Sequence, residues 1–121
     1  MRLPTLAIFA PLVALAAADY MVVNTVCLLG SGCTSQNGMW YSGYGTYPIN
    51  ANDGCRNPGE IPAMYSICVD WANSRGHFFF NGQPKRCLRK TEDGEYWCPS
   101  PAPRLIPTCY RSVWSEVACT W

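Results

Sequence analysis

Eight cysteines constrain the fold of this 121-residue chain more than any other feature of its sequence. An even number of cysteines in a short exported chain predicts four disulfides, formed in an oxidising compartment. Structural zinc is the alternative, but the chain has no Cys-x-x-Cys pair and a single histidine, so the usual ligand spacing is absent. We therefore expect a cysteine-rich, disulfide-bonded protein that holds no metal. The cysteines are Cys27, Cys33, Cys55, Cys68, Cys87, Cys98, Cys109 and Cys119.

Residues 1–18 have the three parts of a secretory signal peptide. Arg2 supplies a positive start, residues 3–15 are mostly apolar, and Ala16 and Ala18 place small residues at the −3 and −1 positions of a cleavage site. The apolar run is shorter than the roughly 20 residues that a membrane helix needs, and no later run is longer. The sequence thus predicts a secreted, extracellular protein with one domain, residues 19–121, and no membrane span.

The charge of the predicted mature chain is close to zero. The whole chain has nine Lys and Arg and eight Asp and Glu, and the only basic residue before position 19 is Arg2. A near-neutral surface does not favour nucleic acid or anionic lipid as a partner. No phosphate-cradling glycine loop and no hydrolase motif occurs, so we expect no cofactor. We also expect a monomer.

The pattern along the chain is one of strands and turns. Residues 20–29 are rich in Val and Leu and predict a buried strand. Asn81-Gly82 is a strong hairpin turn, which predicts that the strand 77–80 pairs with 85–90. Asp93-Gly94 predicts a second turn and a third strand over 95–98. The expected fold class is mainly β, a small disulfide-stapled sandwich or barrel.

Two further segments carry structural expectations. The apolar residues of 63–73 recur at helical spacing, so we expect one short helix there, although their alternation also fits a strand. Residues 108–121 alternate as a final strand, with Cys109 and Cys119 pointing inward and Trp114 on the other face.

The final strand limits the disulfide pairing. Cys109 and Cys119 are ten residues apart, which is about 33 Å along a strand, and a disulfide needs Cα atoms within about 7 Å. These two cysteines should therefore join the strand to two different neighbours. Cys27 and Cys33 are close enough to close a small loop around the turn at 30–32. The remaining pairings stay open.

His77 is the only candidate for acid–base chemistry. As the single histidine it has a pKa suited to proton transfer near neutral pH. A small hydrolase or ribonuclease built on His77 would place it in a pocket, near a Glu and an Arg. Because no nucleophile motif accompanies it, we expect no catalytic residue and no enzyme.

Two groups of residues are candidates for a binding surface. Lys85, Arg86, Arg89 and Lys90 form a basic run that can dock an acidic partner, or else simply protect the edge of a hairpin. The aromatic group can stack on sugar rings if it is exposed, and otherwise belongs to the core. Its members are Trp40, Tyr41, Tyr44 and Tyr47, of which Trp40, Tyr41 and Tyr44 are expected to form the binding surface.

As a whole the chain resembles the small secreted cysteine-rich, effector-like proteins of filamentous fungi. The resemblance rests on the leader, the short mature chain, eight spaced cysteines and many aromatic residues. It implies extracellular action at a host interface, where the protein binds a host protein or a cell-wall component and promotes virulence or modulates host defence. The alternative is a carbohydrate-binding module for chitin or glucan.

Overall fold

A single curled antiparallel sheet forms the protein. The computed structural model describes residues 18–34, 36–100 and 105–121, so the predicted leader lies outside the described residues except for Ala18. No helix occurs in these ranges, which confirms the predicted mainly β class. The sheet order is β4-β3-β1-β9-β8-β7-β6-β5, with β2 paired to β1. The strands are β1 Tyr20–Leu28, β2 Gly32–Cys33, β3 Asn37–Ser42, β4 Gly45–Asn50, β5 Gly54–Arg56, β6 Met64–Asp70, β7 Arg75–Phe80, β8 Arg86–Tyr96 and β9 Pro107–Val117.

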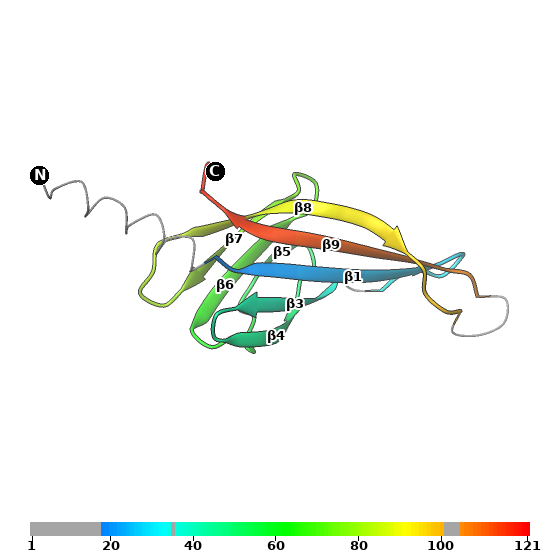
Figure 1. Ribbon diagram of the computed structural model, residues 1–121, viewed down its shortest axis with the longest axis horizontal. Helices are drawn as coiled ribbons and strands as arrows, with labels where there is room; N and C mark the ends of the chain where they lie inside the picture. The colour runs from blue at the N-terminus through cyan, green and yellow to red at the C-terminus, as the bar shows by residue number, and fades with distance from the viewer. Residues whose placement is uncertain (1–17, 35, 101–104) are drawn as a thin grey trace, which may run out of the picture.

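The centre of the sheet confirms two local predictions. The Val-rich segment forms β1, which pairs with β3 on one side and with β9 on the other. Asn81 and Gly82 lie in the turn that joins β7 to β8, as predicted, and Gly82 has a positive φ of 76°. Asn81 does not have a positive φ, so the turn differs from the two-residue type that the sequence favours. Beyond this centre, β8 and β9 continue as a long ribbon away from the chain ends (Figure 1).

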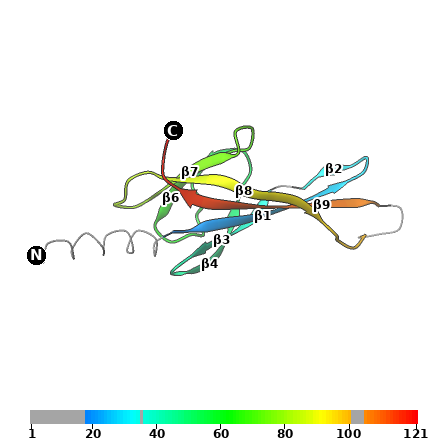
Figure 2. The same cartoon turned by 45° about the horizontal axis from the view of Figure 1, so that its top comes forward.

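The sheet curls so that distant strands meet across its concave side. Trp40 of β3 and Phe78 of β7 contact edge to face at 4.7 Å, although β1, β9 and β8 lie between their strands. Trp71 and Trp114 make a similar contact at 4.8 Å. Figure 2 shows the two wings of the sheet on either side of β1 and β9. Aromatic contacts therefore join the two wings of the sheet, and buried aliphatic side chains such as Met21, Ile67 and Leu88 fill the core around them.

The predicted helix over 63–73 is wrong. Residues 64–70 form β6, which pairs with β5 and β7. A β-bulge between Met64 and Ser66 shifts the alternation by one residue, so Met64 and Ile67 both face the core. The resulting i, i+3 spacing of buried residues imitates a helical pattern.

The predicted third strand of a meander is also wrong. β8 runs without a turn through Asp93-Gly94, because β9 pairs with it along its whole length. A β-bulge between Lys90 and Glu92 shifts the register between β8 and β9 by one residue. In the last part of the chain Cys109 is buried as predicted, but Cys119 is exposed, and Trp114, which was predicted on the other face, is fully buried.

Four disulfides are present, as predicted. They join Cys27 to Cys33, Cys55 to Cys68, Cys87 to Cys119, and Cys98 to Cys109. The small loop between Cys27 and Cys33 is confirmed, and so is the absence of a bond between Cys109 and Cys119. However, both of these cysteines bind β8 or the residues just after it, and not two different neighbours.

None of the described residues forms a helix with the length and hydropathy that crossing a bilayer requires.

Candidate binding cleft

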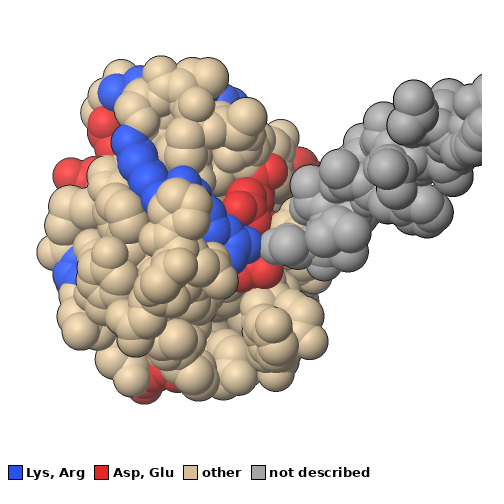
Figure 3. Space-filling view, turned by 90° about the vertical axis from the view of Figure 1, so that its left-hand side faces the viewer, with Lys and Arg blue, Asp and Glu red and all other residues tan. Residues whose placement is uncertain are grey.

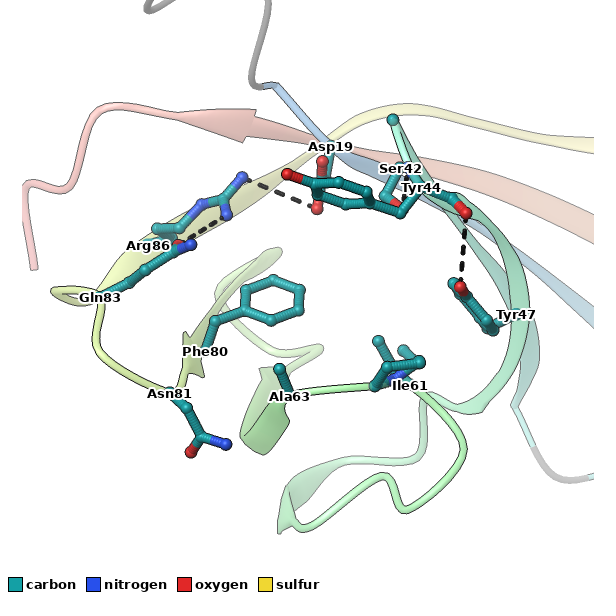
Figure 4. Close-up of a pocket in the computed structure, with 12 residues that line it drawn as sticks. Asp19, Ser42, Tyr44, Tyr47, Ile61, Ala63, Phe80, Asn81, Gln83 and Arg86 are labelled. Carbon is teal, nitrogen blue, oxygen red and sulfur yellow. Dashed lines mark hydrogen bonds and ion pairs between the residues drawn. The ribbon is translucent and has the colours of Figure 1, made fainter.

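A cleft of about 640 Å³ opens at the end of the sheet where β1 begins. Ligand pockets commonly measure about 300–1,000 Å³. Four parts of the chain meet there: the residue before β1, the β3–β4 hairpin, the loop before β6, and the β7–β8 hairpin (Figure 4). Its lining is Asp19, Ser42, Gly43, Tyr44, Tyr47, Ile61, Pro62, Ala63, Phe80, Asn81, Gln83 and Arg86.

Arg86 is the centre of the charged side of the cleft. Its Nε and Nη2 each donate to a different carboxylate oxygen of Glu116 at 2.7 Å, and its Nη1 donates to Gln83 Oε1 at 3.0 Å. Nη2 also lies 3.7 Å from Asp19 Oδ2. The hydrogen bond with Glu116 raises the pKa of Arg86 above its ordinary value. The guanidinium is thus fixed in direction by a bidentate pair.

Asp19 lies between the charged group and the aromatic core. Trp40 Nε1 donates to Asp19 Oδ2 at 3.1 Å, and this bond is buried. Burial raises the pKa of the Asp19 carboxyl above its ordinary value, while the bond from Trp40 and the charge of Arg86 oppose that effect. Figure 3 views this end of the molecule and shows basic and acidic side chains side by side.

Tyr44 forms the opposite rim of the cleft. It is 95% exposed, at the tip of the β3–β4 hairpin. Its backbone is held from both sides, because its N–H donates to Ser42 Oγ at 3.2 Å and its carbonyl accepts from Tyr47 Oη at 3.4 Å. In Figure 4 the ring reaches over the cleft toward Asp19 and Arg86, with Phe80 below it. The cleft therefore combines an exposed aromatic ring with fixed polar groups.

The predicted aromatic surface does not exist as one platform. Trp40 is fully buried in the core, so it is not a surface residue. Tyr41, its neighbour in the strand, is on the other face of the sheet and stacks on Tyr20 at 4.7 Å. Successive side chains of a strand point to opposite faces, which separates Trp40 from Tyr41. Of the predicted aromatic group, Tyr44 and Tyr47 line the cleft.

The predicted basic run is divided by the same alternation. Arg86 lines the cleft, and Lys90 lies over the ring of Trp71 with its Nζ 3.0 Å from Asp93 Oδ2. The other two residues of the run, Lys85 and Arg89, contact Trp121 instead. The Lys85 ammonium donates to the Trp121 carbonyl, and Arg89 Cζ lies 5.0 Å from the centre of the indole ring.

A second basic group on the outer face was missed from the sequence. Arg75 lies opposite Arg89 in the β7–β8 ladder, and its Cζ is 5.3 Å from the same Trp121 ring. Within the described ranges, neither arginine makes an ion pair with a carboxylate. Asp70 lies opposite Arg75 in the β6–β7 ladder, and the charge of Arg75 contributes to lowering the pKa of its carboxyl. Two guanidinium groups on one indole therefore form a basic surface with one carboxylate beside it.

His77 also lies on the outer face, outside the cleft. Its ring contacts Phe79 edge to face at 5.9 Å. Burial and then the charge of Lys85 lower its pKa below the ordinary value. Among the described residues no ion pair or hydrogen bond joins His77 to a glutamate.

The part of the chain that the structure describes contains no group of three His, Cys, Asp or Glu side chains suited to a metal.

In comparisons with known proteins, the chain matches no protein family, no curated protein and no solved structure. Four disulfides are typical of an extracellular protein. Beyond that, its function is inferred from the chemistry of its own surface.

Proposed function

We propose that this is a secreted, extracellular, non-enzymatic binding protein whose cleft holds a sugar unit of a cell-wall glycan. The observation that carries the proposal is the exposed Tyr44 ring opposite the fixed Arg86–Glu116 pair. A sugar has an apolar ring face, which packs on an aromatic side chain, and hydroxyl groups, which bind charged and amide groups in fixed directions. Asn81 and Gln83 also line the cleft and add amide groups to it.

The architecture supports binding by a preformed site. Walls held in place before a ligand arrives lose less conformational entropy on binding. The Cys87–Cys119 disulfide follows Arg86 directly. In the hairpin that carries Tyr44, the Ser42 hydroxyl donates to the Gly45 carbonyl and accepts from the Tyr44 N–H. In line with the resemblance to fungal effector-like proteins, we propose that such binding serves virulence or modulates host defence.

Sedimentation with insoluble chitin and β-glucan, followed by calorimetry with their soluble oligomers, tests the proposal. We expect the protein to sediment with one of these glycans and Tyr44→Ala to reduce its affinity by up to about tenfold, since a well-placed aromatic contact contributes about 0.5–1.5 kcal/mol. Tyr65→Ala is the matched control, because Tyr65 is 48% exposed on another strand and does not line the cleft. Absence of the protein from every pellet, or equal loss in both variants, would contradict the proposal.

A second function is favoured by Arg75 and Arg89 on Trp121, which fit an acidic surface of a host protein. Retention on immobilised polyglutamate measures this interaction. We expect Arg89→Gln to elute at lower salt than Arg111→Gln, which removes the same charge from an exposed position of β9. Identical elution of the two variants would show that only net charge matters.

A further inference from the structure

Three charged side chains cluster where β1 begins, and their charges do not balance. The side chains of Asp19 and Glu116 are 8% and 18% exposed, and that of Arg86 is 18% exposed. Two carboxylates thus share one guanidinium in a largely buried place. Buried charges require partners, so one further cation would balance the formal charge of these three side chains.

The backbone nitrogen of Asp19 already occupies the position that such a cation would take. It lies 2.9 Å from Glu116 Oε1 and donates a hydrogen bond to it. The same two residues are linked again by the Glu116 N–H, which donates to the Asp19 carbonyl at 3.1 Å. Asp19 therefore extends the β1–β9 ladder by one position, but directs its own N–H to a side chain.

Asp19 is also the residue that follows the predicted cleavage site. Ala16 and Ala18 fit the −3 and −1 positions of that site, and Ala18 is exposed. Hydrolysis of the Ala18–Asp19 peptide bond turns the Asp19 amide nitrogen into an α-ammonium group, and leaves a carboxylate on the released leader.

We infer that processing between Ala18 and Asp19 creates an α-ammonium group that binds Glu116 and completes a two-cation, two-carboxylate cluster at the edge of the cleft. Glu116 Oε1 then accepts from both Arg86 Nη2 and the new ammonium. Burial and the charge of Glu116 raise the pKa of Asp19, and a positive group at its own nitrogen opposes both effects. Cleavage thereby favours the ionised form of the Asp19 carboxyl, which lines the cleft.

The position of the cut decides whether the cluster forms. Cleavage after Ala16 would leave two residues before Asp19 and move the ammonium by up to about 7 Å along an extended chain. The Asp19 N–H would still reach Glu116, but it would carry no charge. The inference needs no ligand in the cleft, so it stands apart from the proposal of glycan binding.

Three forms of the protein separate the charge from the hydrogen bond. One begins at Asp19, one begins at Ala18, and one begins at Asp19 with an acetylated nitrogen. All three retain the N–H donor, but only the first has a charge on it. We expect the first form to have a folding equilibrium constant about fivefold larger than the other two near pH 7, because a charged donor contributes more than a neutral one.

A double-mutant cycle with Glu116→Gln tests whether the difference in stability comes from the ion pair between the α-ammonium group and Glu116. The difference among the three forms should disappear in Glu116→Gln and persist in Glu95→Gln, a control in the exposed part of β8. Equal stability of the three forms, or a difference that survives Glu116→Gln, would overturn the inference. N-terminal sequencing of the secreted natural protein must give Asp19 as the first residue, and any other start also overturns it.

An NMR titration of the α-amino group gives a readout that needs no substitution. The charged groups that face it are Glu116 from β9, Arg86 from β8 and its own carboxylate. Since carboxylates outnumber the guanidinium, its pKa should exceed the ordinary range of about 7.7–8.0. Stability from the pair is then present below that range and is lost as the pH rises through the folded pKa. A pKa within or below the ordinary range would contradict the ion pair.

Discussion

Replacement of Arg86 by methionine tests whether one ion pair holds the cleft together. Methionine retains the aliphatic stem that packs near Phe78 and Phe80, whose ring centres lie 5.0 and 5.4 Å from the guanidinium carbon. It removes the two 2.7 Å bonds to Glu116 and leaves that carboxylate beside Asp19 without the guanidinium. The substitution therefore isolates the loss of charge from the loss of packing.

The expected loss of stability for Arg86→Met is about 2–3 kcal/mol. Removal of one partner from a fully buried pair costs about 3–5 kcal/mol, and an exposed pair contributes only about 0–1 kcal/mol. The two side chains here are each 18% exposed, so water reaches the freed carboxylate and lowers the upper figure. A domain of this size has about 5–10 kcal/mol in total, so the change is large enough to measure.

Urea unfolding of the oxidised protein, followed by tryptophan fluorescence, measures the loss. Trp40 and Trp114 are fully buried, so their emission reports the core. We expect an unchanged m-value, and a smaller effect below about pH 3, where carboxylates are generally protonated and no longer need a cation. Arg111→Met, an exposed control, should change stability by less than about 0.5 kcal/mol. An equal loss at both pH values would refute an electrostatic cause.

Three shorter predictions concern the rest of the fold. Burial and a neighbouring lysine lower the pKa of His77 below 6.5, so as the pH falls the unfolded chain binds a proton at His77 before the folded chain does. The free energy of unfolding should therefore decrease below pH 6.5. In urea unfolding, His77→Gln should reduce this dependence of stability on pH. Gly76→Ala should cost about 1–3 kcal/mol in thermal unfolding, because a Cβ would lie 2.7 Å from a carbonyl oxygen of β6, whereas Gly94→Ala meets nothing within 4 Å and should be neutral. Replacement of Cys87 and Cys119 by serine opens a 32-residue loop and should cost about 4 kcal/mol, against about 2 kcal/mol for the 6-residue loop between β1 and β2; equal losses in chemical unfolding would contradict the loop-entropy origin.

Features that depend on neighbouring residues were predictable from the sequence. The Val-rich pattern of β1 and the Asn81-Gly82 turn both act over a few residues, and both lie where the sequence predicts them. The disulfide exclusion between Cys109 and Cys119 also succeeded, because it required only the rise of a strand. The helix prediction over 63–73 failed because of the bulge in β6, where one extra residue changes which side chains share a face.

Features that depend on the register between strands were not predictable. A two-residue turn at 81–82 would place Arg75 opposite Leu88, but the observed ladder places it opposite Arg89. The Gln83 N–H donates to the Phe80 carbonyl at 3.1 Å, but ladder pairing resumes only at Arg86, one residue out of the two-residue register. The group of two arginines on Trp121 follows from that shift. Likewise, nothing in the sequence around Asp19 indicates that the curl of the sheet brings it to Trp40 and Arg86.

The position of one disulfide connects the stability of the fold to the cleft. In β8, Arg86 points to the concave side and the next residue, Cys87, points away and binds Cys119. In the last part of the chain, Glu116 precedes Cys119 by three residues. The disulfide thus fixes both backbones immediately behind the Arg86–Glu116 pair. Its removal should therefore weaken ligand binding as well as stability, whereas loss of the distant β1–β2 disulfide should lower stability and leave the affinity of the cleft unchanged.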